Sequence, residues 1–195
     1  MLGKRIQFAA FLVAGLALAA CASTRIVESW KAPGTGQLHF QKVLAVAILK
    51  NQGLRQNAED ALKGNLKNVQ AVQSYTMFDL GDLVDRDKAK ERLRKEGFDG
   101  VVALRLTQSR QELSWTTYPT MPVDTFWGYY GAYYPVAEMR VDTVVMVEIK
   151  IYSLTDDKLV WAGVSETFNP KNSATLISEI AVEAGKELRR QGLIS

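Results

Sequence analysis

The 195-residue sequence contains one cysteine and one histidine, Cys21 and His39. A single cysteine allows no internal disulfide, and zinc sites built from several cysteines or histidines are absent. His39 is the only histidine that could act as a base, and no G-x-S-x-G sequence accompanies it. The nearest match, Gly163-Val164-Ser165-Glu166, lacks the second glycine, and Ser-x-x-Lys and phosphate-binding loops are also missing. The sequence therefore argues against an enzyme, and we expect no cofactor.

Neither metal binding nor nucleic-acid binding is indicated. A cluster of acids at Asp79, Asp82, Asp85 and Asp87 lacks the glycine position and closing glutamate of a calcium loop, and is typical of a helix start. The chain has 24 basic and 21 acidic residues. Because Lys4 and Arg5 belong to the N-terminal segment, the remaining chain is close to neutral. We expect no metal and no nucleic-acid partner.

The long apolar run is confined to the N-terminus. Two basic residues precede an apolar stretch over residues 6–18, which has the length of a signal-peptide core and is short for a membrane span. Leu18-Ala19-Ala20-Cys21 then resembles the lipobox of bacterial lipoproteins. The resemblance implies cleavage before Cys21, a diacylglyceryl group on its sulfur and an acyl chain such as palmitate on its amine. Ala22 in place of aspartate implies the outer membrane, facing the periplasm. Secretion with cleavage after Ala17-Leu18-Ala19, and an uncleaved anchor, are the alternatives.

The remaining sequence predicts a lipidated tether over residues 21–41 and one α/β domain over 42–195. Apolar runs predict strands at 42–49, 71–78 and from Gly100, the first and third covered on both faces, with helices at 57–66 and 84–93 between them. Residues 139–154 and 159–168 predict an antiparallel hairpin, and Ser173 can cap a closing helix. The order βαβαβ–ββα indicates a mixed, mainly five-stranded sheet with helices packed on it, an α/β (α+β-like) fold.

These elements resemble a widespread, uncharacterised family of bacterial envelope lipoproteins. The matching pieces are Trp30 with Pro33, KVLAVAI, Glu59-Asp60, Ser74-Tyr75, GFDGVVALRL, an aromatic-glycine insertion, KLVWAGVSETFNP and the terminal GLI. The resemblance covers nearly the whole chain after the signal peptide. It implies the α/β fold and an envelope location, and it implies no activity.

An aromatic-rich segment at residues 115–135 connects the third and fourth predicted strands. Prolines and glycines interrupt it, so we expect a long loop. Tyrosine and tryptophan are common in binding surfaces, so an envelope protein partner is one interpretation; a self-packed cover over the sheet, membrane contact and glycan stacking are others. The candidate contact residues are Trp115, Tyr118, Phe126, Trp127, Tyr129, Tyr130, Tyr133 and Tyr134.

Taken together, the sequence predicts a lipid-anchored, periplasm-facing protein that binds rather than catalyses, as an envelope accessory protein. The alternative is a carrier or transport-auxiliary subunit that holds a lipid or other apolar ligand between its sheet and helices.

Overall fold

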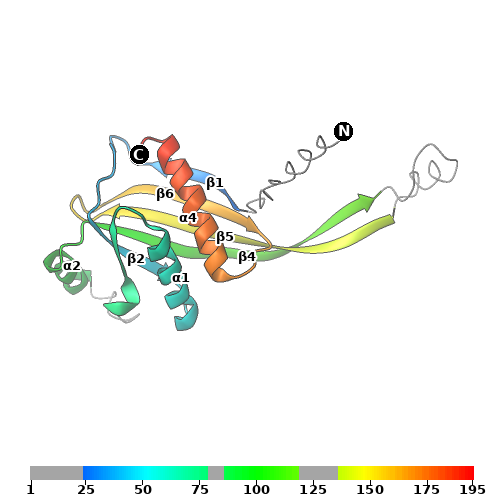
Figure 1. The fold of residues 1–195 in the computed structure, drawn as a ribbon, viewed down its shortest axis with the longest axis horizontal. Coiled ribbons are helices and arrows are strands. Elements are labelled where there is room, and N and C mark those ends of the chain that lie inside the picture. Colours follow the sequence, from blue (N-terminus) through cyan, green and yellow to red (C-terminus); the bar gives the residue numbers. More distant parts are fainter. Residues whose placement is uncertain (1–23, 79–85, 119–135) are drawn as a thin grey trace, which may run out of the picture.

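The computed structural model describes residues 24–78, 86–118 and 136–195. They form one mixed sheet of six strands with three α-helices and a short 3₁₀ helix (Figure 1), which confirms the α/β class. In chain order the elements are β1 (Thr24–Lys31), β2 (Lys42–Ile48), α1 (Gln52–Asn65), β3 (Gln70–Gln73), η1 (Ser74–Thr76), α2 (Arg86–Lys95), β4 (Gly100–Tyr118), β5 (Val136–Ser153), β6 (Lys158–Phe168) and α4 (Ser173–Arg190). None of these helices has the length and apolarity needed to cross a bilayer.

The sheet has a parallel half and an antiparallel half. Its strands lie in the order β1-β6-β5-β4-β2-β3. β2 pairs in parallel with both β3 and β4, as helical crossover connections require. β4, β5 and β6 are successive antiparallel neighbours, and β1 pairs antiparallel with the outer side of β6. β2, β3, β4 and β6 therefore all run toward the same end of the sheet.

The helices cover the two faces of the sheet unequally. α1 and α4 lie side by side on one face (Figure 1). There Ile180 of α4 shares a core with Val147 and Ile149 of β5. On the other face, a smaller core joins Leu44 of β2 to Leu93 of α2. Successive β2 side chains alternate between these two cores, so the prediction that this strand is covered on both faces is confirmed.

The prediction of five strands is wrong, because residues expected in the tether form β1. Thr24 to Lys31 pair with β6, and the register shifts between Ile26 and Glu28, which makes a β-bulge. A bulge interrupts the alternation of side chains, so this strand shows no clear period in the sequence. The following residues also return along the body, where the Leu38 N–H donates to the Leu193 carbonyl at 2.7 Å. Residues 24–41 are therefore part of the domain.

Helix boundaries depend on asparagine caps that the predictions missed. α1 begins at Gln52, earlier than the predicted 57–66, because the Asn51 side chain accepts a hydrogen bond from a first-turn N–H. α4 begins at Ser173, but Asn172 rather than Ser173 provides the cap. The predicted apolar stripe of α4 is confirmed, since Ile177, Ile180, Ala184 and Leu188 are all buried.

Candidate functional site

β4 and β5 continue together beyond the rest of the sheet as a two-stranded ribbon (Figure 1). β2 pairs with β4 only as far as Arg105, and β6 pairs with β5 only from Val144 onward. The pairing of β4 with β5 extends to Tyr118 and Val136. We define the ribbon as residues 111–118 and 136–143. At about 3.3 Å per residue it projects roughly 25 Å past the body.

Exposed apolar side chains line one face of the ribbon. Leu113 lies opposite Val141 in the strand register, and Met139 follows on the same face. The exposed fractions are 63% for Leu113, 56% for Met139 and 54% for Val141. On the same face of β5 but within the body, Val145 is 7% exposed because it belongs to the core beneath the helices. We call Leu113, Met139 and Val141 the apolar row; it continues the core face of the sheet past the helices.

Polar contacts fix the direction in which the ribbon leaves the body. Asn169, just after β6, accepts a hydrogen bond from the Thr143 N–H at 2.7 Å and donates to the Asp142 carboxylate at 2.6 Å. Its backbone N–H also donates to the Thr143 carbonyl. Asn169 has a φ of 47°, a left-handed conformation that asparagine tolerates. The Arg110 guanidinium lies 3.7 Å from the Glu166 carboxylate of β6, which adds an ion pair near the base of the ribbon.

The structure places part of the predicted aromatic site on this ribbon. Trp115 and Tyr118 belong to β4, so the predicted loop at residues 115–135 begins later than expected. The register sets Trp115 opposite Met139 of the apolar row. The other predicted contact residues lie outside the described residues, as does Cys21: Phe126, Trp127, Tyr129, Tyr130, Tyr133 and Tyr134. Sequence analysis did not identify the apolar row.

The N-terminus of the domain lies at the level where the ribbon begins. Thr24 pairs with Thr167 of β6, which in turn pairs with Val145 of β5. Thr24 is buried, and its hydroxyl donates to the Glu179 carboxylate at 2.6 Å. The Thr167 hydroxyl therefore donates to the Thr24 oxygen, at 2.8 Å. Only two residues separate this fixed strand end from Cys21.

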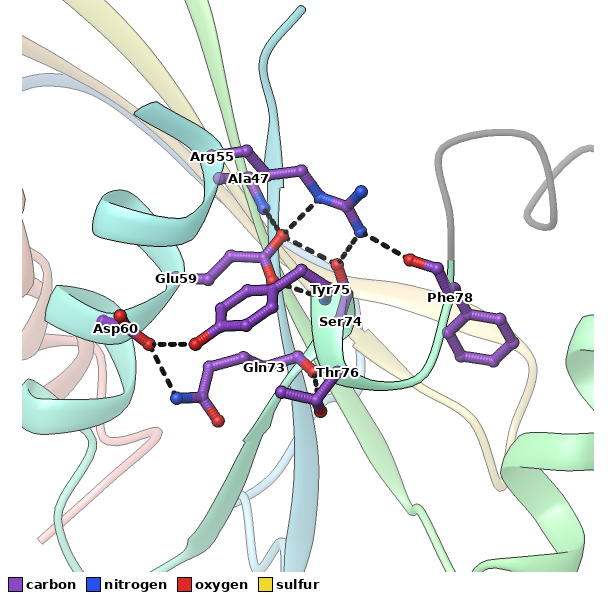
Figure 2. A network of polar contacts seen from close by, with 9 residues as sticks. All are labelled: Ala47, Arg55, Glu59, Asp60, Gln73, Ser74, Tyr75, Thr76 and Phe78. Atoms are coloured by element: carbon purple, nitrogen blue, oxygen red, sulfur yellow. Dashed lines mark hydrogen bonds and ion pairs between the residues drawn. The ribbon is translucent and has the colours of Figure 1, made fainter. Parts of the chain in front are cut away.

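A buried ion pair holds α1 against the sheet (Figure 2). Glu59 is 0% exposed and lies 3.0 Å from Nε of Arg55. Its carboxylate also accepts hydrogen bonds from the Ser74 hydroxyl at 2.7 Å and from the backbone N–H groups of Ala47 and Tyr75, at 3.0 and 2.9 Å. The N–H of Tyr75 is thus bound by a side chain, and η1 replaces the end of the strand predicted at 71–78.

This network is suited to a structural role. Ser74 donates its proton to Glu59 and accepts a hydrogen bond from Arg55 at 2.8 Å. Arg55 also donates to the Phe78 carbonyl at 3.2 Å (Figure 2). Ser74 is 0% exposed, so a substrate has no access to its hydroxyl. The charges balance and the carboxylate is surrounded by donors, as a stable buried pair requires.

A shallow polar pocket of about 330 Å³ lies at the opposite end of the sheet from the ribbon. His39 lines it, as does Asp99, whose two oxygens accept hydrogen bonds from the N–H groups of Gln41 and Lys42. In the described part of the chain, no cluster of histidine, cysteine or acidic residues could hold a metal ion. Of the four aspartates tested for calcium, only Asp87 is described, and it lies in the first turn of α2.

Comparisons with known proteins give distant matches of fold. No family model matches the chain, and no curated protein matches it. A solved PelC dodecamer from Paraburkholderia phytofirmans is 11% identical with a TM-score of 0.47, over 82% of this chain and 94% of that chain. Lipoprotein GNA1162 from Neisseria meningitidis is 11% identical with a TM-score of 0.40, over 77% of this chain and 99% of that chain. At this level of similarity, the roles and assemblies of those proteins do not extend to this chain.

Proposed function

We propose that the chain is a lipid-anchored, non-catalytic protein of the bacterial envelope that acts by binding. The anchor rests on Leu18-Ala19-Ala20-Cys21 after a signal-like segment, and Ala22 favours the outer membrane facing the periplasm. The binding role rests on one structural observation: the apolar row is more than half exposed on a ribbon that projects from the body.

The physical argument concerns the exposure of the apolar row. An isolated two-stranded ribbon is marginally stable in water. Its apolar side chains gain about 25 cal/mol for each Å² that a contact removes from water. Grouped exposed apolar residues on a projecting element mark an interaction site. We include the aromatic residues of 119–135 in this contact surface, because that segment joins the two strands of the ribbon.

Replacement of Cys21 by serine tests the anchor. In bacteria fed a labelled fatty acid, the natural protein should incorporate the label and pellet with membranes. The Cys21→Ser variant should lack the label and accumulate as the uncleaved precursor. Equal labelling of both proteins would exclude lipidation at Cys21.

Photo-crosslinking in intact cells tests the contact surface. A crosslinking amino acid at Val141 should form adducts with an envelope component, either a protein or a lipid. The matched control is the same amino acid at Thr155, which is exposed in the β5–β6 turn at the opposite end of the sheet. Adducts of equal yield and identity at both positions would show that the ribbon is no more a contact surface than the rest of the molecule.

A further inference from the structure

We propose that the apolar row docks on the bilayer that holds Cys21, so that the ribbon lies along the membrane surface. This inference rests on the lipid anchor proposed above, and it names the occupant of the contact surface. It follows from where the folded chain begins relative to the ribbon and from the chemistry of the two ribbon faces.

The anchor lies very close to the folded body. The chain spans at most about 3.6 Å per residue, so Cys21 is within roughly 11 Å of Thr24. Thr24 cannot extend this reach, because it is buried, paired with Thr167 and hydrogen-bonded to Glu179. The acyl chains therefore hold the start of β1, which lies beside the base of the ribbon, at the headgroup layer.

The position of Thr24 limits how the molecule can tilt. Thr24 begins the edge strand β1 beside the base of the ribbon. From this point β1 runs back along the body, and the ribbon projects in the opposite direction (Figure 1). Lifting the ribbon off the membrane would push the β1 side of the body into the bilayer. Exposed charged residues such as Arg25 and Glu28 oppose this, because charges are costly in hydrocarbon. These charges favour orientations in which the ribbon stays close to the surface.

The ribbon has one face suited to lipid and one suited to water. Its apolar row carries no charge. The opposite face carries Glu112 and Asp142, which are partners in the strand register and directly precede or follow Leu113 and Val141 in the chain. An element with one apolar and one charged side can lie in a bilayer interface with the apolar side inserted.

A bilayer is favoured over a protein partner because the anchor supplies it permanently. Attachment through Cys21 converts contact with lipid into an intramolecular event at high effective concentration, so even a weak contact of the apolar row is populated. A protein partner would have to compete with this surface for the same side chains.

Site-directed spin labelling of the anchored full-length protein tests the proposal. Cys21 is the only cysteine, so after lipidation an introduced cysteine is the only free thiol. Labels at Leu113→Cys and Val141→Cys would report the apolar face, and Glu112→Cys would report the polar face of the same strand. The anchored proteins are placed in phosphatidylethanolamine–phosphatidylglycerol vesicles. The readout is accessibility to oxygen, which concentrates in lipid, relative to a water-soluble nickel chelate.

Docking on lipid predicts a ratio severalfold higher at positions 113 and 141 than at 112. Equal ratios at the three positions on vesicles would overturn the proposal. So would a difference that arises only after envelope proteins are added, because the occupant would then be a protein. Flotation of each labelled protein with its vesicles is measured first: failure to float refutes the anchor itself, whereas flotation with equal ratios refutes only the docking of the ribbon.

Discussion

Glu59 is a residue whose loss should disturb the fold strongly. Glu59→Gln removes the negative charge and leaves Arg55 charged at 1% exposure. Breaking a buried pair from one side typically costs about 3–5 kcal/mol, so we expect the free energy of unfolding to fall by about that amount. Denaturant unfolding followed by circular dichroism measures it.

The control for this change is Glu91→Gln. Glu91 pairs with Lys95 on α2, but both side chains are largely exposed, at 64% and 74%. Exposed pairs contribute less than about 1 kcal/mol, so this variant should unfold close to the natural protein. Equal effects of the two substitutions would mean that the Arg55–Glu59 network does not hold α1 in place.

Gly163 is required by the ring of Trp161. A Cβ atom at position 163 would lie 2.4 Å from the ring, and Trp161 is 0% exposed and has no room to move. Gly163→Ala should therefore lower the free energy of unfolding by about 1–3 kcal/mol, the usual cost of overpacking. Gly64→Ala is the matched control, because nothing lies within 4 Å of its Cβ position in α1. It should stabilise the protein by up to about 1 kcal/mol. Thermal unfolding distinguishes these opposite signs.

The structure gives roles to residues that the sequence could identify only as short segments resembling a family of envelope lipoproteins. Glu59-Asp60 and Ser74-Tyr75 prove to be partners: Glu59 binds the Ser74 hydroxyl, and Asp60 accepts a hydrogen bond from the Tyr75 hydroxyl at 2.7 Å (Figure 2). Gly163 lies within another matching piece. Contacts between residues distant in sequence leave no local pattern, so their roles required the structure.

At the scale of elements, regular apolar patterns were predictable and interrupted ones were not. The α4 stripe and the continuous apolar run of β2 both predicted the correct element. β1 was missed because its bulge breaks the alternation, and the length of the ribbon was missed because Gln111 to Thr116 are mixed in polarity. The apolar row could have been recognised from Met139 and Val141, which continue the alternation of β5.

The contact between β1 and α4 should make stability depend on pH. The Arg190 guanidinium, with the Ser29 hydroxyl and the Gln191 amide, lowers the pKa of the Glu187 carboxyl to about 2. Because the folded pKa is below the unfolded one, the contact stabilises the fold fully above about pH 5 and is lost as the pH falls toward 2. Arg190 is 72% exposed, so screening reduces the contribution to at most about 1 kcal/mol.

Urea unfolding at a series of pH values from about 5 to about 2 measures this dependence. Glu187→Gln should lose at most about 1 kcal/mol near neutral pH and show a smaller further loss in acid. Ser29→Ala removes only one of the donors to Glu187 and should give an intermediate acid dependence. An unchanged acid dependence in Glu187→Gln would show that this carboxylate is not a source of the pH effect.

For the molecule as a whole, sequence and structure imply different distances from the membrane. A tether over residues 21–41 would let the domain move tens of ångströms from the bilayer, whereas β1 leaves two residues between Cys21 and the sheet. The sequence could not reveal this, because β1 becomes a strand only by pairing with β6, far along the chain. This difference changes how the anchored protein should respond to a protease.

Trypsin treatment of the anchored protein on vesicles distinguishes the two arrangements. Arg25 and Lys31 are trypsin sites in β1, and cleavage after either would cut the chain between the anchor and the rest of the domain. A protease needs an unpaired segment, and β1 is hydrogen-bonded to β6, so cleavage there should require unfolding. Lys67, in the exposed connection between α1 and β3, serves as the internal control for accessible chain.

We expect cutting after Lys67 while the body still sediments with the vesicles, and cutting after Arg25 or Lys31 only in denaturant. The destabilised Glu59→Gln variant should release fragments faster, because unfolding is populated more often. Rapid cleavage after Arg25 in the natural protein, with Lys67 left intact, would mean that β1 detaches from β6 on the membrane. The anchor would then no longer fix the ribbon end of the sheet at the bilayer, and the docking of the apolar row would lose its geometric basis.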